Sequence, residues 1–133
     1  MSFVYSMYGK AATALGAKNP LARTASVSQQ LKFANSYGSG LNVIPIKGVY
    51  GAAASYTPHS GDILCWKRRG GSKNDIGKLW PGHTGLAISR SGLHLLTIEG
   101  NTGRSFADGD GCYKKWRPVK NILAVIRVRE VVS

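Results

Sequence analysis

The strongest chemical signal in the sequence is a histidine and a glutamate that flank a predicted β-hairpin. His83 lies in the segment Pro81 to Gly85, and Glu99 opens Glu99-Gly100-Asn101 after a second apolar run. A carboxylate or amide that holds an imidazole in one tautomer makes it a defined proton acceptor. This spacing therefore suggests a general base, His83, with Glu99 or Asn101 as the group that orients it.

The expected turn brings the two side chains together. If Arg90 to Gly92 form a three-residue loop, Ser89 pairs with Leu93, and counting back along both strands places His83 opposite Glu99. Opposed residues have Cβ atoms about 4.5 to 5.5 Å apart, within reach of a hydrogen bond between longer side chains. The alternative interpretation is that His83 is a polar strand-end residue and Glu99 begins a turn.

A base of this type needs a nucleophile, and the first turn of a helix stabilises a thiolate. Asn19 and Pro20 predict the start of a second helix, which would run to about Asn35, but its opening residues contain no cysteine. Cys65 lies within an apolar strand pattern and Cys112 in a glycine-rich turn, so we expect two free thiols that are not catalytic.

The remaining elements predict a single α+β domain over residues 1–133, with helices first and an antiparallel sheet after them. Apolar spacing favours a first helix over residues 3–15, and residues 41–60 read as an irregular wrapping loop. Strand patterns cover residues 63–67, 84–89, 93–98, 113–116 and 122–132.

The charge balance narrows the class of partner without naming a reaction. Eighteen Lys and Arg against six Asp and Glu give a formal net charge of +12, which favours polyanionic partners such as nucleic acid or anionic cell-wall polymer. No apolar run approaches the roughly 20 residues of a membrane span, and MSFVYSMYGK lacks the features of a secretory signal. The cysteines and histidines do not make a metal site, and we expect no cofactor.

Four segments resemble the cysteine- and histidine-dependent amidohydrolases and peptidases called CHAP domains, of the NlpC/P60 papain-like superfamily. They are SGDILCWKR, WPGHTGLAIS, LLTIEGNTG and ILAVIRV, within a resemblance that covers roughly residues 19 to 129. The most specific part is Gly-His-x-Gly followed by Glu-x-Asn. The resemblance implies a papain-like fold and a peptidoglycan amide hydrolase, either amidase or endopeptidase, with an active-site groove between the second helix and the hairpin.

The resemblance also assigns positions, and the chain departs from it at the most important one. It puts the nucleophile on Ala22, where a cysteine is expected, with His83 as the base and Glu99 or Asn101 as its orienter. Ser60 replaces a proline that often precedes Gly-Asp in the family. Alanine at position 22 fits either an engineered Cys-to-Ala change or a natural pseudoenzyme. The alternative function is therefore a catalytically dead module that binds peptidoglycan or nucleic acid.

Aromatic and basic residues near His83 are the candidate substrate contacts: Trp66, Arg68, Arg69 and Trp80. Both tryptophans can equally be core residues, and the basic loop can be a solvated surface. We expect a monomer that is made in the cytoplasm and acts at the bacterial wall, as a phage-borne enzyme or an effector delivered by a secretion system. An effector would also have an immunity protein as a partner.

Overall fold

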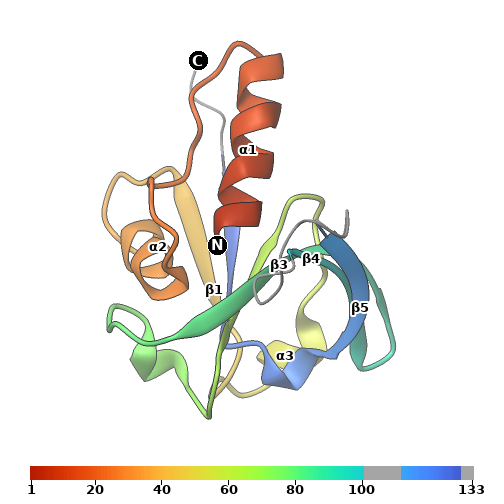
Figure 1. Ribbon diagram of the computed structural model, residues 1–133. Helices are drawn as coiled ribbons and strands as arrows, with labels where there is room; N and C mark the ends of the chain where they lie inside the picture. Colours follow the sequence, from red (N-terminus) through yellow and green to blue (C-terminus); the bar gives the residue numbers. More distant parts are fainter. Residues whose placement is uncertain (101–111, 130–133) are drawn as a thin grey trace.

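The computed structural model describes residues 1–100 and 112–129 of the chain. Within these residues it has an α+β fold built on one antiparallel sheet with strand order β1-β6-β2-β3-β4-β5. The helices are α1 (Ser2–Ala14), α2 (Val27–Ala34) and α3 (Ala52–Ser55). The strands are β1 (Leu41–Pro45), β2 (Ile63–Lys67), β3 (Gly82–Ser91), β4 (His94–Gly100), β5 (Cys112–Pro118) and β6 (Ala124–Val128). The predicted fold class, helices followed by an antiparallel sheet, is confirmed at this level (Figure 1).

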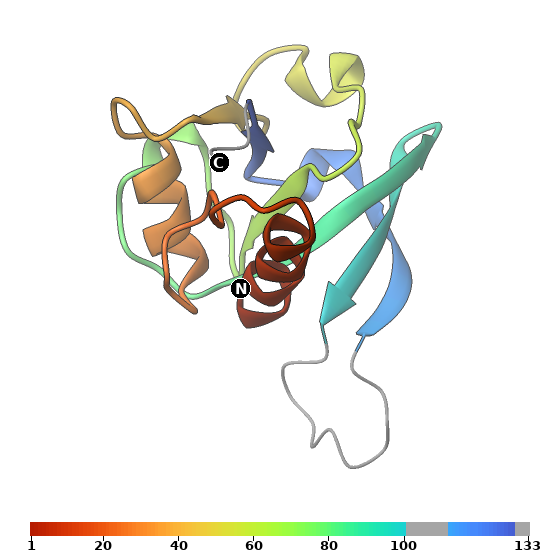
Figure 2. The ribbon, with the colours of Figure 1, turned by 90° about the horizontal axis from the view of Figure 1, so that it is seen from above.

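The sheet separates two apolar clusters, because successive residues of a strand point to opposite faces. In β2, Ile63 and Cys65 pack with residues of α1 and α2, such as Val4 and Leu31. Leu64 and Trp66, also in β2, pack on the other face with Tyr56 and Val119, and α3 packs against that cluster through Ala52 and Ala53. Figure 2 shows α1 and α2 on one side of the strands and α3 on the other. We call these the helix face and the opposite face.

The second helix is shorter than the sequence predicts. It begins at Val27 rather than near Asn19, with Ser26 as the N-cap that accepts a hydrogen bond from Gln29 N–H. Asn19 instead closes a local turn, in which its Oδ1 accepts from Leu21 N–H at 3.0 Å. The prediction that position 22 lies in the first turn of a helix is therefore wrong.

The segment that the sequence presents as a loop contains an edge strand. β1 pairs along its whole length with β6, from Leu41 opposite Val128 to Pro45 opposite Ala124. The partner strand lies about eighty positions downstream, so the local pattern of small and apolar residues does not show the pairing. In the part of the chain that the structure describes, no helix is long and apolar enough to cross a membrane.

Candidate functional site

The hairpin that carries His83 and Glu99 has a different register from the predicted one. Ser91 pairs with His94 across a two-residue turn, so Ser89 lies opposite Leu96 and not Leu93. The register then shifts between Ala87 and Ser89, which marks a bulge. The predicted three-residue loop and the predicted direct opposition of His83 and Glu99 are therefore wrong.

The two side chains nevertheless meet, because the error amounts to two residues and an even shift keeps both on one face. Leu86 pairs with Ile98, so one step further Gly85 lies opposite Glu99. Glu99 reaches diagonally across Gly85, and His83 Nε2 lies 2.7 Å from Glu99 Oε1. A Cβ at Gly85 would lie 2.8 Å from Glu99 Cγ, so the missing side chain leaves room for this diagonal contact. The predicted hydrogen bond is confirmed, by a different geometry.

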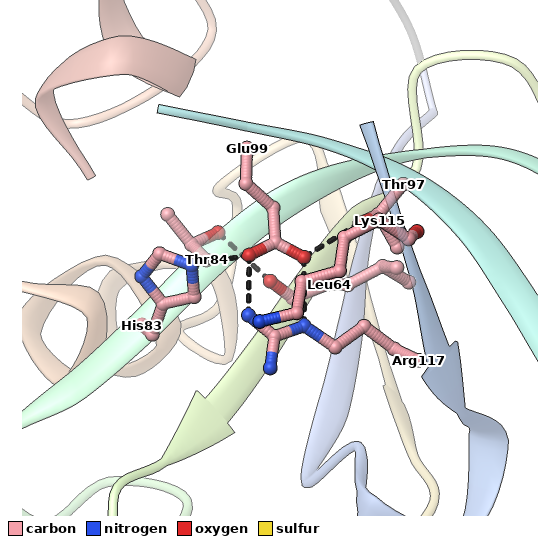
Figure 3. A network of polar contacts seen from close by, with 7 residues as sticks. All are labelled: Leu64, His83, Thr84, Thr97, Glu99, Lys115 and Arg117. Carbon is pink, nitrogen blue, oxygen red and sulfur yellow. Dashed lines mark hydrogen bonds and ion pairs between the residues drawn. The ribbon is translucent and has the colours of Figure 1, made fainter. Parts of the chain in front are cut away.

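Glu99 is fully buried and is held by three side chains (Figure 3). Arg117 on β5 donates from Nε to Oε2 at 2.8 Å and from Nη2 to Oε1, and Thr97 Oγ1 donates to Oε2 at 2.6 Å. Burial alone would raise the pKa of Glu99, but the hydrogen bonds from Arg117, His83 and Thr97 outweigh it and hold the pKa well below its usual range. The carboxylate is therefore ionised at neutral pH.

Arg117 is the functional residue that the sequence reasoning missed. The strand that carries Arg117 was expected only as a short segment near residues 113–116, which leaves out position 117. Arg117 pairs in register with Leu95, and its side chain reaches the carboxylate of Glu99 further along β4. A glutamate inside an apolar strand could have indicated such a partner, because a carboxylate needs a cation when it is buried.

An ionised Glu99 defines which nitrogen of His83 carries the proton. An ionised carboxylate only accepts hydrogen bonds, so Nε2 of His83 carries the hydrogen and Nδ1 of the neutral ring keeps a free lone pair. The ring stacks on Trp66 with centroids 5.8 Å apart, and the Arg117 guanidinium lies 5.2 Å from the centre of the same indole. The imidazole is held at Nε2, and the His83 side chain as a whole is 25% exposed.

A basic cavity of about 570 Å³ opens beside His83. We call it the basic basin. Its lining includes four cationic side chains and two aromatic rings: Lys47, Lys67, Arg68, Arg117, Trp66 and Tyr113.

Of the predicted substrate contacts, Trp66 and Arg68 line the basin, and Trp80 and Arg69 do not. Trp80 is buried in the helix-face cluster, and its indole nitrogen donates to the backbone oxygen of Asp75. Arg69 is exposed outside the basin. The core interpretation therefore holds for Trp80.

The structure does not bring Ala22 to the face that carries His83. Its neighbour Leu21 belongs to the helix-face cluster, and the side-chain amide of Gln30 bonds both the N–H and the carbonyl oxygen of Ala22, at 2.8 and 2.7 Å. His83 pairs with Trp66, so its side chain lies on the opposite face. The predicted groove between the second helix and the hairpin is therefore wrong, and Asn101 lies outside the described residues.

Neither cysteine supplies the missing thiol. Cys65 is fully buried on the helix face, and burial raises the pKa of its thiol to about 12. Cys112 is exposed on β5, three strands away from Cys65 in the sheet order, and both are free as predicted. Among residues 1–100 and 112–129, no group of three or more His, Cys, Asp or Glu side chains is arranged to hold a metal ion.

Comparison of the chain with protein-family models, curated proteins and solved structures gives no match.

Proposed function

We propose that this domain acts on peptidoglycan as an amide hydrolase of the papain-like, CHAP type, with His83 as the general base and Glu99 as the residue that positions it. Asn101 is the second orienting candidate, from its place in the sequence and from the resemblance. The reaction is hydrolysis of an amide bond, either between sugar and stem peptide or within the peptide. A protein of this kind would be made in the cytoplasm and act at the bacterial wall.

The contact between His83 Nε2 and Glu99 Oε1 is the observation that carries the proposal. It fixes the ring and its tautomer and leaves Nδ1 of the neutral imidazole as the proton acceptor. The His83 side chain is 25% exposed and lines a cavity of about 570 Å³. The bidentate Arg117 keeps the positioning carboxylate ionised while it is buried.

The nucleophile is the part of the proposal that this chain does not supply in its present sequence. Amide hydrolysis of this type begins with attack of a thiolate sulfur on the carbonyl carbon, and the resemblance assigns that sulfur to position 22, where the chain has alanine. Ala22 is not in a helical first turn, and its neighbour Leu21 packs in the helix-face cluster, whereas His83 lies on the opposite face. A thiol at position 22 would therefore need the loop before α2 to move before His83 could deprotonate it.

The test is digestion of purified peptidoglycan by the parent protein and three variants: Ala22→Cys, Ala22→Cys with His83→Ala, and Ala22→Cys with His59→Ala. New amino groups and product masses are measured. The hydrolase proposal requires release by Ala22→Cys, none by the parent, and loss of release with His83→Ala but not with His59→Ala, because His59 is an exposed residue outside the basin. A folded Ala22→Cys variant that releases nothing from several wall types would overturn the hydrolase proposal.

A second candidate is a module that binds peptidoglycan or nucleic acid without cutting it. It is favoured by the composition of the basin, which combines four cations with two aromatic rings and has no thiol in its lining. Sedimentation of the parent protein at increasing salt, with purified wall fragments and separately with nucleic acid, distinguishes the two ligands. Binding to nucleic acid weakens steeply and log-linearly with salt, whereas a muramyl peptide held by the basin is less sensitive.

A further inference from the structure

The positive charge of the basic basin exceeds what the described residues neutralise. Its cations come from three segments that the fold brings together: Lys47 after β1, Lys67 and Arg68 at the end of β2, and Arg117 on β5. Of the six acidic residues in the chain, three lie in the described part, and each is already paired.

Only two of these pairs involve basin cations. Asp75 pairs with Lys67 at 3.3 Å, and Glu99 pairs with Arg117. Lys47 donates to the backbone oxygen of Gly70 at 3.0 Å, and Arg68 has no ion pair within residues 1–100 and 112–129. The basin therefore offers at least two cationic groups to an external anion.

Arg117 and Trp66 add hydrogen-bond donors at the same place. Arg117 uses Nε and Nη2 for Glu99, and Nη1 of its guanidinium has no hydrogen-bond partner among the described residues. Trp66 is 8% exposed, and its Nε1 is a buried donor that has no hydrogen-bond partner among the described residues. A buried donor without an acceptor costs free energy, and Trp66 belongs to the lining of the basin, so a ligand that supplied an acceptor to Nε1 would remove that cost.

The cavity is also limited in size. A volume of about 570 Å³ suits a short peptide or a single acidic group with its neighbours, not a polymer that lies along an extended stripe of charge. His83 lies in the same lining, so a peptide held by its acidic group in the basin would lie beside the imidazole.

We propose that the basic basin binds a free carboxylate of a peptidoglycan stem peptide and so presents the neighbouring amide to His83. This inference rests on the proposed function, which supplies the peptide. Arg68 and Lys47 are the specificity residues for the carboxylate, and Arg117 is a positioning residue that connects the bound carboxylate to Glu99. The chemistry that is recognised is the negative charge of the acid, and not the sugar.

Calorimetric titration of the unmodified protein tests the inference, because binding needs no turnover. The probes are the tripeptide L-alanyl-γ-D-glutamyl-L-lysine and the same peptide with the glutamyl α-carboxylate amidated. We expect the acid to bind about five- to tenfold more tightly than the amide. Arg68→Gln, and more strongly Lys47→Gln with Arg68→Gln, should remove that preference. Arg69→Gln is the matched control, because it removes one positive charge from the neighbouring position outside the basin.

The outcomes separate this inference from the hydrolase proposal. Selective binding of the acid without any hydrolysis would support the basin and count only against the enzyme. Equal affinity for acid and amide, equal effects of Arg68→Gln and Arg69→Gln, or no binding at millimolar peptide would overturn the inference. Tighter, Arg68-dependent binding of inorganic phosphate or of a single-stranded oligonucleotide than of the peptide would also overturn it, in favour of a phosphate ligand.

Discussion

Two buried carboxylates in this domain have the same kind of arginine partner and differ in their other hydrogen-bond partners. Glu99 and Asp62 are 0% and 1% exposed, and each accepts a bidentate pair from an arginine on a strand: Arg117 for Glu99 and Arg127 for Asp62. In both carboxylates, burial raises the pKa. The hydrogen bonds, first of all those from the arginine, lower the pKa by more than burial raises it, so the net shift is downward. Electrostatics alone does not distinguish the two sites.

The remaining partners do distinguish them. Asp62 also accepts from Tyr56 Oη at 2.6 Å and from His59 N–H at 3.0 Å, so it stabilises the turn before β2. Glu99 instead holds the imidazole of His83, which keeps one nitrogen free beside the basic basin. A buried carboxylate–arginine pair is thus a support in both places. It becomes part of a candidate active site only where the group it supports has an unused proton acceptor and a cavity.

Loss of either arginine should have the largest effect. Arg117→Met and Arg127→Met each leave a buried carboxylate without its main counter-charge, and we expect each to lower the free energy of unfolding by about 3 kcal/mol. Urea denaturation measures this, with the exposed Arg69→Met as control and Glu99→Gln/Arg117→Met as the variant that restores part of the loss. Only the Arg117 change should also weaken peptide binding. Equal loss of binding in both variants would remove the distinction between the sites.

Acid should destabilise the protein through both carboxylates. The folded-state pKa of each lies below its ordinary value, 4.5 for the glutamate and 3.8 for the aspartate, so the stabilisation is present above those values and is lost as the pH falls below them. Urea denaturation from neutral pH to about pH 3 should show this loss. Glu99→Gln and Asp62→Asn should each reduce the slope, and by more than Asp75→Asn, because the Asp75 side chain is 18% exposed and not fully buried. An acid slope unchanged in Glu99→Gln would contradict the ionised state of Glu99.

The smallest expected change in unfolding free energy distinguishes Tyr56, which contacts Asp62, from His83, which contacts Glu99. Tyr56→Phe removes a buried hydroxyl that donates to Asp62, and it should cost about 1 to 2 kcal/mol of unfolding free energy. His83→Gln keeps an N–H for Glu99 at a partly exposed position, and it should cost less than about 0.5 kcal/mol. Thermal and urea denaturation measure both. If His83→Gln proves as costly as Tyr56→Phe, His83 is a structural residue.

The sequence predicts the elements whose signals are local. The boundaries of β2, residues 63–67, agree with the strand predicted there, and α1 follows its apolar spacing. The start of α2 was mispredicted because Asn19-Pro20 satisfies every local rule for a helix start, while the side chain of Gln30 holds the backbone of Ala22 in a loop. That competing contact depends on a side chain eight positions away.

The same distinction between local signals and long-range packing applies to the candidate site. The meeting of His83 with Glu99 follows from the sequence alone, because it requires only that both residues lie on one face of neighbouring strands, and a two-residue error in register preserves the face. Arg117, the side of the sheet that carries the site, and the gathering of Lys47 and Arg68 around His83 were decided by tertiary structure. These depend on which strands become neighbours and on how the bulge shifts them, and long-range packing sets both.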